Sequence, residues 1–570
     1  MNRSNGNARL APHRSGKVWL ILLVILVAMG GTLAYLWSRN TSPSSTVSAQ
    51  IDSAPAPGPG SAESPTAPPS TATKTTATPQ PFVQDWPQPA FVLAITGQQH
   101  GYIEPCGCSP KQSGGLARRA DLFRQLREVK KWPVLALETG GTLEDSRVSR
   151  RQSVLKFNMI LDSLNDMGYR ALGLGTEELK LGATKLFGIS LERNVQEGFD
   201  MPFLAANVLL LSSTELGTPK AYRVLEIGGQ DVDGKKVGGM KVAVTSVFGN
   251  EYKQQFSLIS EDDLKITDPI AALTAVLVEM KAQKPDVLVV LSYDTMEASR
   301  ELATKFPELD VVVSADGADD PGDDYETIGK TLFFVSGMKG KHVNLVGFYP
   351  GEKVSVRFER VELDQDRFGR HPQIRKLMAK YQGLLKEEWL NPSSEVRMLT
   401  QSHPSGYKFM GAKSCKACHA SAYEVWEGSN HAHATASLLD GRPEEKGEWI
   451  DRTYDPECLC CHATGWEATD AYPYKDGFID AVTTPHLLGN QCETCHGPAS
   501  EHVKLEIDWK KAGGKITDEL TASRTFLRVT KAQAEKKVCL KCHDFDNSPK
   551  FDFQEYWPQI EHPTPKAVKR

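Results

Sequence analysis

Four copies of one five-residue pattern lie in the last third of the chain. The 570 residues include 11 cysteines, and eight of these belong to repeats that read Cys-x-x-Cys-His. The repeats are Cys415 and Cys418 with His419, Cys458 and Cys461 with His462, Cys492 and Cys495 with His496, and Cys539 and Cys542 with His543. Two thiols at this spacing on one helical turn can bond both vinyl groups of a porphyrin, and the adjacent histidine then reaches the iron as proximal ligand. The pattern predicts four covalently attached c-type haems.

Paired Cys-x-x-Cys motifs are also typical of zinc ribbons. A zinc ribbon, however, has no need of a histidine directly after every second cysteine. We therefore favour haem over zinc.

The same segment contains six further histidines, enough to supply a second axial ligand to every iron. A histidine cannot easily reach the far face of a haem whose near face is held by its own helix, so we expect each distal ligand to come from another segment. His431 and His433 are two residues apart and cannot point the same way on a helix, and His431 is the favoured one. A solvated surface histidine is the alternative at each position. The distal candidates are His431, His486, His502 and His562, with His433 as an alternative; His403 is the sixth histidine.

The N-terminal segment predicts a membrane anchor. Val18 to Trp37 is an apolar run of 20 residues without a charge, which is long enough to cross a bilayer as a helix. Basic residues precede it, so the positive-inside rule keeps residues 1–17 in the cytoplasm and exports the rest. A buried core helix is the less favoured alternative. We expect a single-pass protein of the inner (cytoplasmic) membrane whose main part is periplasmic.

The chain after the anchor divides into regions of different composition. Ser, Thr, Pro and Ala dominate residues 38–89, which predicts a disordered linker. Apolar runs such as Phe91 to Thr96 alternate with helix-like stretches such as Leu116 to Val129 over residues 90–365, which indicates an α/β domain. A connecting helix is expected within 366–405, and the haem motifs occupy 406–570. A formal net charge of −5 offers no basic surface, so we expect no nucleic-acid partner.

The haem-motif segment resembles the tetrahaem cytochrome c554 family from about Tyr407 to His562. The resemblance rests on Trp426, Ser429-Asn430-His431, Thr484-Pro485-His486, the Cys-His-Gly-Pro run that precedes His502, and the terminal His562. It implies a mostly α-helical domain with haems that are mostly bis-histidine ligated, one of which can be five-coordinate. It also implies electron transfer between a periplasmic oxidoreductase and downstream carriers.

The α/β segment resembles the 5′-nucleotidase branch of the calcineurin-like metallophosphatases from about Ala90 to Phe348. The similar stretches are Ala94 to Gly101, Gly114 to Arg118, Leu137 to Leu143, Leu172 to Leu179 and Pro202 to Val208. This resemblance implies an α/β sandwich with two metal ions held by Asp, His and Asn side chains. His100 and Asn207 are kept, but other ligand positions are occupied by Gln98, Gly141, Thr176-Glu177, Tyr293, Asp316 and Ala318. Hydrolysis by the family mechanism is therefore not expected, and weak binding of one ion by Glu177, Glu178 and Asp316 stays open.

Two cysteines follow His100 in the same loop. Cys106 and Cys108 could bind a soft metal such as copper or zinc together with His100, or could be free or externally bridged. Cys460, inside the second motif, is most simply a spare buried thiol.

The sequence as a whole predicts a multidomain protein: an N-terminal transmembrane helix, an α/β metallophosphatase-like sandwich and a mostly α multihaem cytochrome c domain. The leading hypothesis is electron transfer with periplasmic redox proteins, beside a catalytically silent sandwich. One alternative is a haem oxidoreductase that acts on a small nitrogen compound at an open iron. Another is a metal-dependent phosphohydrolase with an accessory cytochrome.

Overall fold

The computed structural model describes residues 81–105, 112–148, 150–212, 219–232, 235–350, 355–398, 400–441 and 449–562, all within one compact unit that spans 77–570. The predicted cytoplasmic segment 1–17, the predicted anchor 18–37, most of the predicted linker, Cys106 and Cys108 lie outside these residues. Among the described helices, none combines the length and the apolar composition needed to cross a bilayer.

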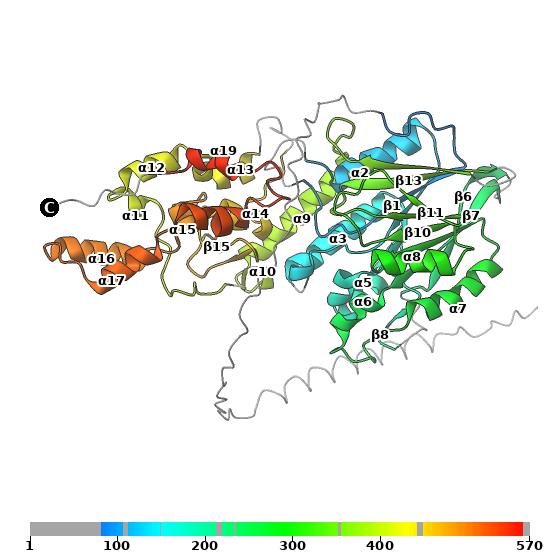
Figure 1. Ribbon diagram of the computed structural model, residues 1–570, viewed down its shortest axis with the longest axis horizontal. Coiled ribbons are helices and arrows are strands. Elements are labelled where there is room, and N and C mark those ends of the chain that lie inside the picture. The colour runs from blue at the N-terminus through cyan, green and yellow to red at the C-terminus, as the bar shows by residue number, and fades with distance from the viewer. Residues whose placement is uncertain are drawn as a thin grey trace, which may run out of the picture. The chain divides into compact units, whose positions relative to one another are not determined.

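The α/β part, which we call the sandwich, contains two six-stranded sheets (Figure 1). The first has the order β14-β13-β1-β2-β3-β4, with β1 to β4 parallel and β13 antiparallel to both β1 and β14. The second has the order β11-β12-β10-β9-β7-β6. The strands are β1 Phe91–Thr96, β2 Val134–Glu138, β3 Tyr169–Gly173, β4 Phe203–Leu204, β13 His342–Tyr349, β14 Ser355–Glu362, β6 Tyr222–Val232, β7 Lys235–Phe248, β9 Val287–Tyr293, β10 Val311–Ser314, β11 Glu326–Ile328 and β12 Thr331–Val335. Strands β5 Val208–Leu210 and β8 Leu264–Ile266 form a separate pair.

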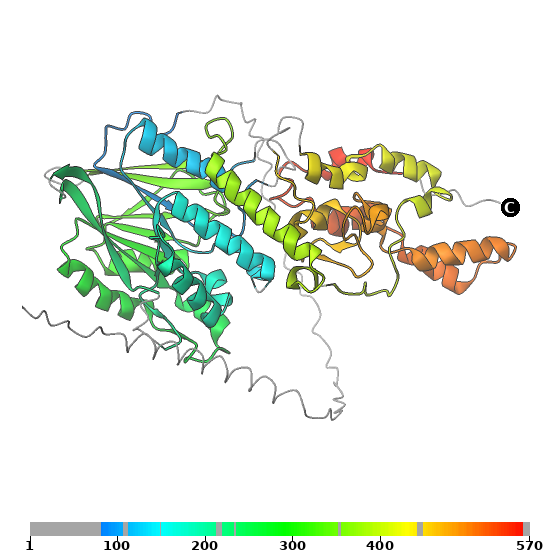
Figure 2. The same cartoon turned by 180° about the vertical axis from the view of Figure 1, so that it is seen from behind.

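The two sheets pack face to face, and helices cover their outer faces. Along β1, Phe91, Leu93 and Ile95 lie between the sheets, whereas Val92 and Ala94 pack into the core under the helices. This division follows the two-residue period of a strand buried on both sides. Helices α2 Leu116–Arg124, α3 Arg151–Asp166 and α9 Pro372–Leu390 lie side by side over the first sheet, as Figure 2 shows, and α7 Pro269–Ala282 and α8 Met296–Lys305 cover the second. The predicted α/β sandwich is confirmed.

The folded part begins before the predicted end of the linker at Pro89. Phe82 and Val83 are buried in the core beneath α2, and the Val83 amide donates a hydrogen bond to the Glu359 carboxylate at 2.8 Å. Two apolar residues in a Pro- and Thr-rich context carry too little periodicity to be recognised, which is why the linker prediction extends too far.

Helix α9, which contains the predicted connecting helix, belongs to both cores. Ile374, Met378 and Tyr381 are buried in the sandwich core, whereas Trp389 is fully buried in the next cluster and stacks on Trp466 with ring centres 5.5 Å apart. One rigid helix therefore joins the two parts of the unit.

The haem-motif region, described over residues 400–441 and 449–562, consists of short helices. Its two strands, β15 Trp466–Glu467 and β16 Tyr472–Pro473, have two residues each. The α-helices of four or more residues are α11 Lys413–Lys416, α12 Ala420–Glu427, α13 Ala434–Asp440, α14 Pro456–His462, α15 Cys492–His496, α16 Ser500–Lys511, α17 Asp518–Phe526 and α19 Phe553–Tyr556. The sandwich further contains α4 Thr176–Lys180, α5 Ala183–Val195 and α6 Asn250–Lys253, and α10 Glu395–Met398 follows α9.

Candidate functional site

Each motif folds as about one turn of helix, which brings its histidine back toward its first cysteine. The amide of His419 donates to the carbonyl of Cys415 at 2.9 Å, and the amide of His543 donates to the carbonyl of Cys539 at 2.9 Å. Helix α15 consists of the third motif alone and ends at Gly497, whose φ of 86° stops the helix. The helical turn assumed from the spacing is therefore present.

Three pairs of histidine rings lie at a separation that would fit an iron between them. The ring centres are 6.4 Å apart for His419 and His502, 6.0 Å for His431 and His543, and 5.9 Å for His496 and His562. Two metal–nitrogen bonds of about 2 Å, plus about 1 Å from each nitrogen to its ring centre, predict a separation of about 6 Å. The described residues thus fit bis-histidine haem ligation.

In each pair, a histidine from a Cys-x-x-Cys-His motif meets one from a distant segment. His502 lies beside His419 of the first motif, not beside His496, its own neighbour in the chain. His486 lies in the turn Pro485–Leu487, and His433 ends the turn Asn430–His433 that also carries His431. His403 packs into an aromatic cluster, with its ring centre 4.9 Å from that of Tyr474.

Hydrogen bonds to Nδ1 orient three of the motif histidines. Nδ1 lies 2.8 Å from the Ala434 carbonyl in His462, 2.7 Å from the Leu527 carbonyl in His496, and 3.0 Å from the Ser548 hydroxyl in His543. A partner at Nδ1 fixes the ring orientation and leaves Nε2 for a metal, as is usual for ligating histidines.

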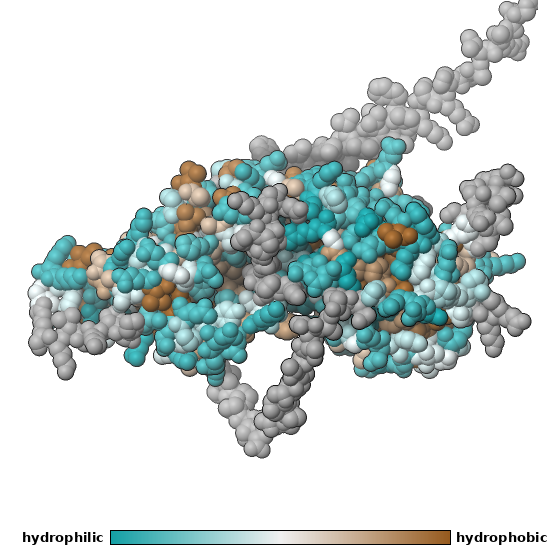
Figure 3. Space-filling model, turned by 90° about the horizontal axis from the view of Figure 1, so that it is seen from above, coloured by the Kyte–Doolittle hydropathy of each residue, from teal (hydrophilic) through white to brown (hydrophobic). Residues whose placement is uncertain are grey.

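The region also offers exposed apolar surface near the motifs. Phe545 is 68% exposed and Leu540 is 51% exposed, and Ile507 and Phe526 are likewise exposed. On the face drawn in Figure 3, hydrophobic side chains form separate patches within a mostly hydrophilic surface. A porphyrin is a large apolar group, so it could cover such side chains.

Cysteines of different motifs are neighbours in space. Cys415 in the first motif lies close enough to Cys492 in the third for their thiols to interact, and Cys542 in the fourth lies similarly close to Cys461 in the second. Cys495 of the third motif lies close enough to Cys539 of the fourth for an electrostatic interaction. The motifs therefore follow one another in the spatial order first, third, fourth, second.

At the edge of the sandwich, the Glu178 carboxylate binds two loops. It accepts hydrogen bonds from the amides of Thr142 at 2.7 Å, Gly175 at 2.8 Å and Gly141 at 3.1 Å, and from the Thr142 hydroxyl. These donors come from the loops that follow β2 and β3. The carboxylate joins these loops through backbone hydrogen bonds.

Residues that replace metal ligands also fill the site. A Cβ at Gly141 would collide with the Gln98 side chain, and a Cβ at Gly175 would collide with the Tyr293 ring. Asn207 is kept, but its amide group donates to the carbonyls of Phe248 and Thr267 and accepts from the Phe248 amide. Among the described residues, no group of three or more His, Cys, Asp or Glu side chains is placed to hold a metal ion.

Glu177 and His100 form a mostly buried contact at the same edge. The Tyr293 hydroxyl donates to the Glu177 carboxylate at 2.8 Å, and His100 Nδ1 lies 3.6 Å from the other carboxylate oxygen. Burial, with help from the negative charge of Glu178, raises the pKa of Glu177 to about 8. Burial also lowers the pKa of His100. Glu177 therefore keeps its proton at neutral pH.

This raised pKa makes the stability of the sandwich depend on pH. Folded Glu177 holds a proton that the unfolded chain releases above about pH 4.5, so the stability that it contributes is complete below that pH and is lost as the pH rises toward 8. Glu177→Gln should remove the dependence, which is at most about 1.4 kcal/mol per pH unit within this window. Thermal unfolding of both proteins between pH 5 and 8 measures the difference. Glu279→Gln, at an exposed position on α7, is the control and should keep the wild-type dependence on pH. If the stability of the wild type and of Glu177→Gln changed with pH in the same way, the prediction would be contradicted.

Comparison with known proteins agrees with the haem motifs. The family model described as "Cytochrome c554 and c-prime" matches residues 414–497. The chain is 26% identical over 176 residues to cytochrome c-554 of Nitrosomonas europaea. This alignment covers 28% of this chain and 70% of that protein. It is 32% identical over 127 residues to the multihaem cytochrome MtrA of Shewanella baltica, which covers 20% of this chain and 34% of that one.

Among solved structures, the chain is similar to a 5′-nucleotidase precursor from Thermus thermophilus, with a TM-score of 0.42 and 17% identity. That similarity covers 52% of this chain and 59% of the nucleotidase. Residues 414–497 in the C-terminal part of the chain thus match the cytochrome c554 family, a family that implies covalently bound haem c.

Proposed function

We propose that this protein is a membrane-anchored c-type cytochrome that transfers electrons in the periplasm through four haems. The observation that carries the proposal is the set of three imidazole pairs, with ring centres 5.9 to 6.4 Å apart, each containing a motif histidine. Each haem iron, when bound, would exchange one electron by cycling between its ferric and ferrous states.

The protein would close both axial positions of most irons. His502, His431 and His562 are the distal ligands that the geometry favours for the first, fourth and third motifs. For the second motif, which contains His462, the candidates are His486 and His433. Two histidine ligands suit outer-sphere electron transfer, because no ligand needs to bind or leave.

Contacts between motifs support a continuous path. The thiols of Cys415 and Cys492 lie close enough to interact, as do those of Cys461 and Cys542, so porphyrins attached there would be close neighbours. We infer that electrons pass in the spatial order first, third, fourth, second motif, or in reverse.

The sandwich would serve as a scaffold without hydrolytic activity. The side chains of Glu178 and Asn207 are already used by backbone hydrogen bonds, and Gln98 and Tyr293 occupy space beside the glycines. Redox partner proteins of the periplasm would therefore interact with the haem-motif region.

Export should be required for haem attachment. Because covalent attachment of c-type haem takes place outside the cytoplasm, we expect the full-length chain in the membrane fraction with four haems per chain that titrate reversibly. A chain that lacks Met1 to Trp37 and has no substitute export signal should be haem-free. Haem content per chain and a redox titration are measured for the full-length chain and for the truncated chain. A full complement of haem in the truncated cytoplasmic product would contradict the topology.

Removal of one distal histidine should open one iron. His431→Ala should convert about one haem in four from low-spin to high-spin and raise its midpoint potential, since the His543 ring lies 6.0 Å from that of His431. Absorption and paramagnetic resonance spectra measure the spin states. His403→Ala is the control, because His403 packs against Tyr474 and is not a candidate ligand. Equal spectra for wild type and His431→Ala would exclude His431 as a ligand.

No metal-dependent hydrolysis is expected from the sandwich. With Mn²⁺, Zn²⁺ or Mg²⁺, turnover of phosphodiesters and nucleoside monophosphates should stay at background, because the remaining donor side chains already have other partners. Turnover well above background that His100→Ala abolishes would contradict this expectation.

A further inference from the structure

Side chains of the sandwich converge on the first turn of α14, the helix that carries the second haem motif. Asp455 caps this helix, because its carboxylate accepts from the Glu457 amide at 3.0 Å. The same carboxylate accepts from Gln152 of α3 at 2.9 Å and from Gln382 of α9 at 2.7 Å. Asp455 is only 5% exposed. Two sandwich helices therefore fix the start of the motif helix.

A buried cation of the sandwich lies next to the attachment cysteine of this motif. Lys156 of α3 is 4% exposed, and its ammonium group contacts the Glu457 carboxylate and donates to the Gly101 carbonyl at 3.2 Å. Arg147 lies 3.9 Å from the other oxygen of Glu457. Burial alone would raise the pKa of Glu457, but Lys156 and Arg147 outweigh it and lower the pKa. Glu457 is therefore an anion directly before Cys458.

In the third motif, the charge of the acidic residue beside the cysteine is stabilised by backbone amides, not by a lysine. Glu493 lies directly after Cys492 and is 2% exposed, but its carboxylate accepts from the amides of Met410, Gly411 and Ala499. These donors belong to the haem-motif region itself. By contrast, the charge beside the second motif is balanced by a lysine of the sandwich.

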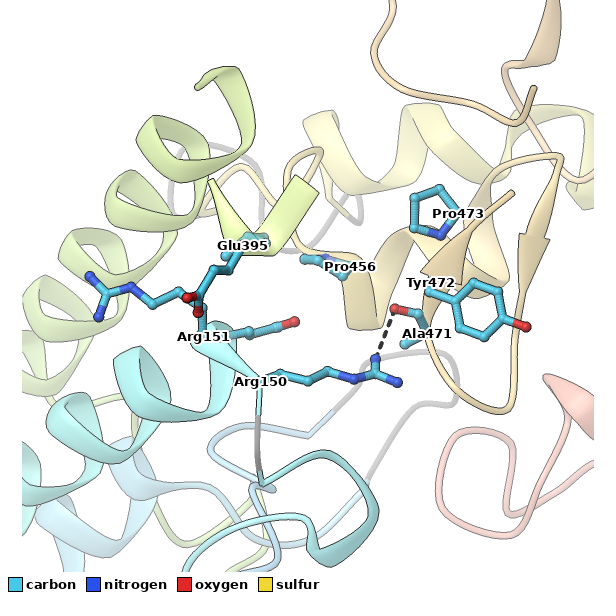
Figure 4. Close-up of a pocket in the computed structure, with 9 residues that line it drawn as sticks. Arg150, Arg151, Glu395, Pro456, Ala471, Tyr472 and Pro473 are labelled. Atoms are coloured by element: carbon cyan, nitrogen blue, oxygen red, sulfur yellow. Dashed lines mark hydrogen bonds between the residues drawn. The ribbon is translucent and has the colours of Figure 1, made fainter. Parts of the chain in front are cut away.

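Further contacts hold this junction together. Arg452, before α14, contacts the Glu104 carboxylate in the loop after β1. Figure 4 shows Arg150 of the sandwich reaching the Ala471 carbonyl, at 3.2 Å, beside the small pocket that Pro456 also lines. The position of Lys156 relative to Glu457 is therefore fixed by several neighbouring contacts.

We propose that the sandwich sets the reduction potential of the haem attached at Cys458 and Cys461 through the ion pair of buried Lys156 with half-buried Glu457. The proposal rests on the electron-transfer function proposed above. A buried anion beside a haem favours the ferric state, and a cation that offsets it raises the potential, because charges interact strongly where water is excluded. The second motif stands at one end of the spatial order of motifs, so this pair would adjust the terminal haem.

Opposite charge changes should move one midpoint in opposite directions. In redox titrations of the full-length holoprotein, Lys156→Met should lower one of the four midpoint potentials, and Glu457→Gln should raise the same one. The double variant should return it close to the wild-type value. Lys281→Met, which removes an exposed cation of α7 that pairs with Glu308, is the control and should change none of the four potentials.

The sign of the shift separates electrostatic tuning from a structural role. Haem content and low-spin spectra check that each variant is folded, and Glu457→Gln alone decides the question if Lys156→Met does not accumulate with four haems. Shifts of the same sign in both variants, or no shift in fully loaded Glu457→Gln, would overturn the proposal and leave electron transfer untouched. A wild-type protein without reversible haem titration would overturn the electron-transfer function and this inference together.

Discussion

An iron between two imidazoles requires ring centres about 6 Å apart, and this requirement accounts for the arrangement of the haem-motif region. The three histidine pairs each join segments that are far apart in the chain, such as His431 near the first motif and His543 in the fourth. The helices between them are short and expose apolar side chains such as Leu540 and Phe545. Haems would supply the contacts that a side-chain core supplies elsewhere, so we expect this region to depend on them for its stability.

At one edge of the sandwich, two neighbouring glutamates make contacts within the protein. Glu178 ties the loops after β2 and β3 together through their amides, and Glu177 stays protonated beside Tyr293. Helix α9 then extends the sandwich core to Trp389 in the next cluster. The loop after β1 supplies Glu104 and the Gly101 carbonyl to the junction with α14.

Local patterns in the sequence predicted the elements well. β1 has the predicted bounds Phe91 to Thr96, and the predicted helix Leu116 to Val129 is α2 continued by one wider turn. From the sequence, His496 could be excluded as the partner of His502, but His419 could not be chosen among the remaining motif histidines. The reason is that a contact between distant segments leaves no local signal in the sequence. The role of Glu178 was equally hidden, since its partners are backbone amides. The contact of Lys156 with Glu457 has no signal in either segment alone.

Anomalous scattering from iron in crystals of the full-length protein measures the central claim most directly. We expect four iron positions per chain, three of which lie midway between the rings of His419 and His502, His431 and His543, and His496 and His562. The fourth should lie beside His462 at one end of the row. Fewer than four iron positions, or irons that lie away from these imidazole pairs, would contradict the proposed electron path and the ligand assignment on which it depends.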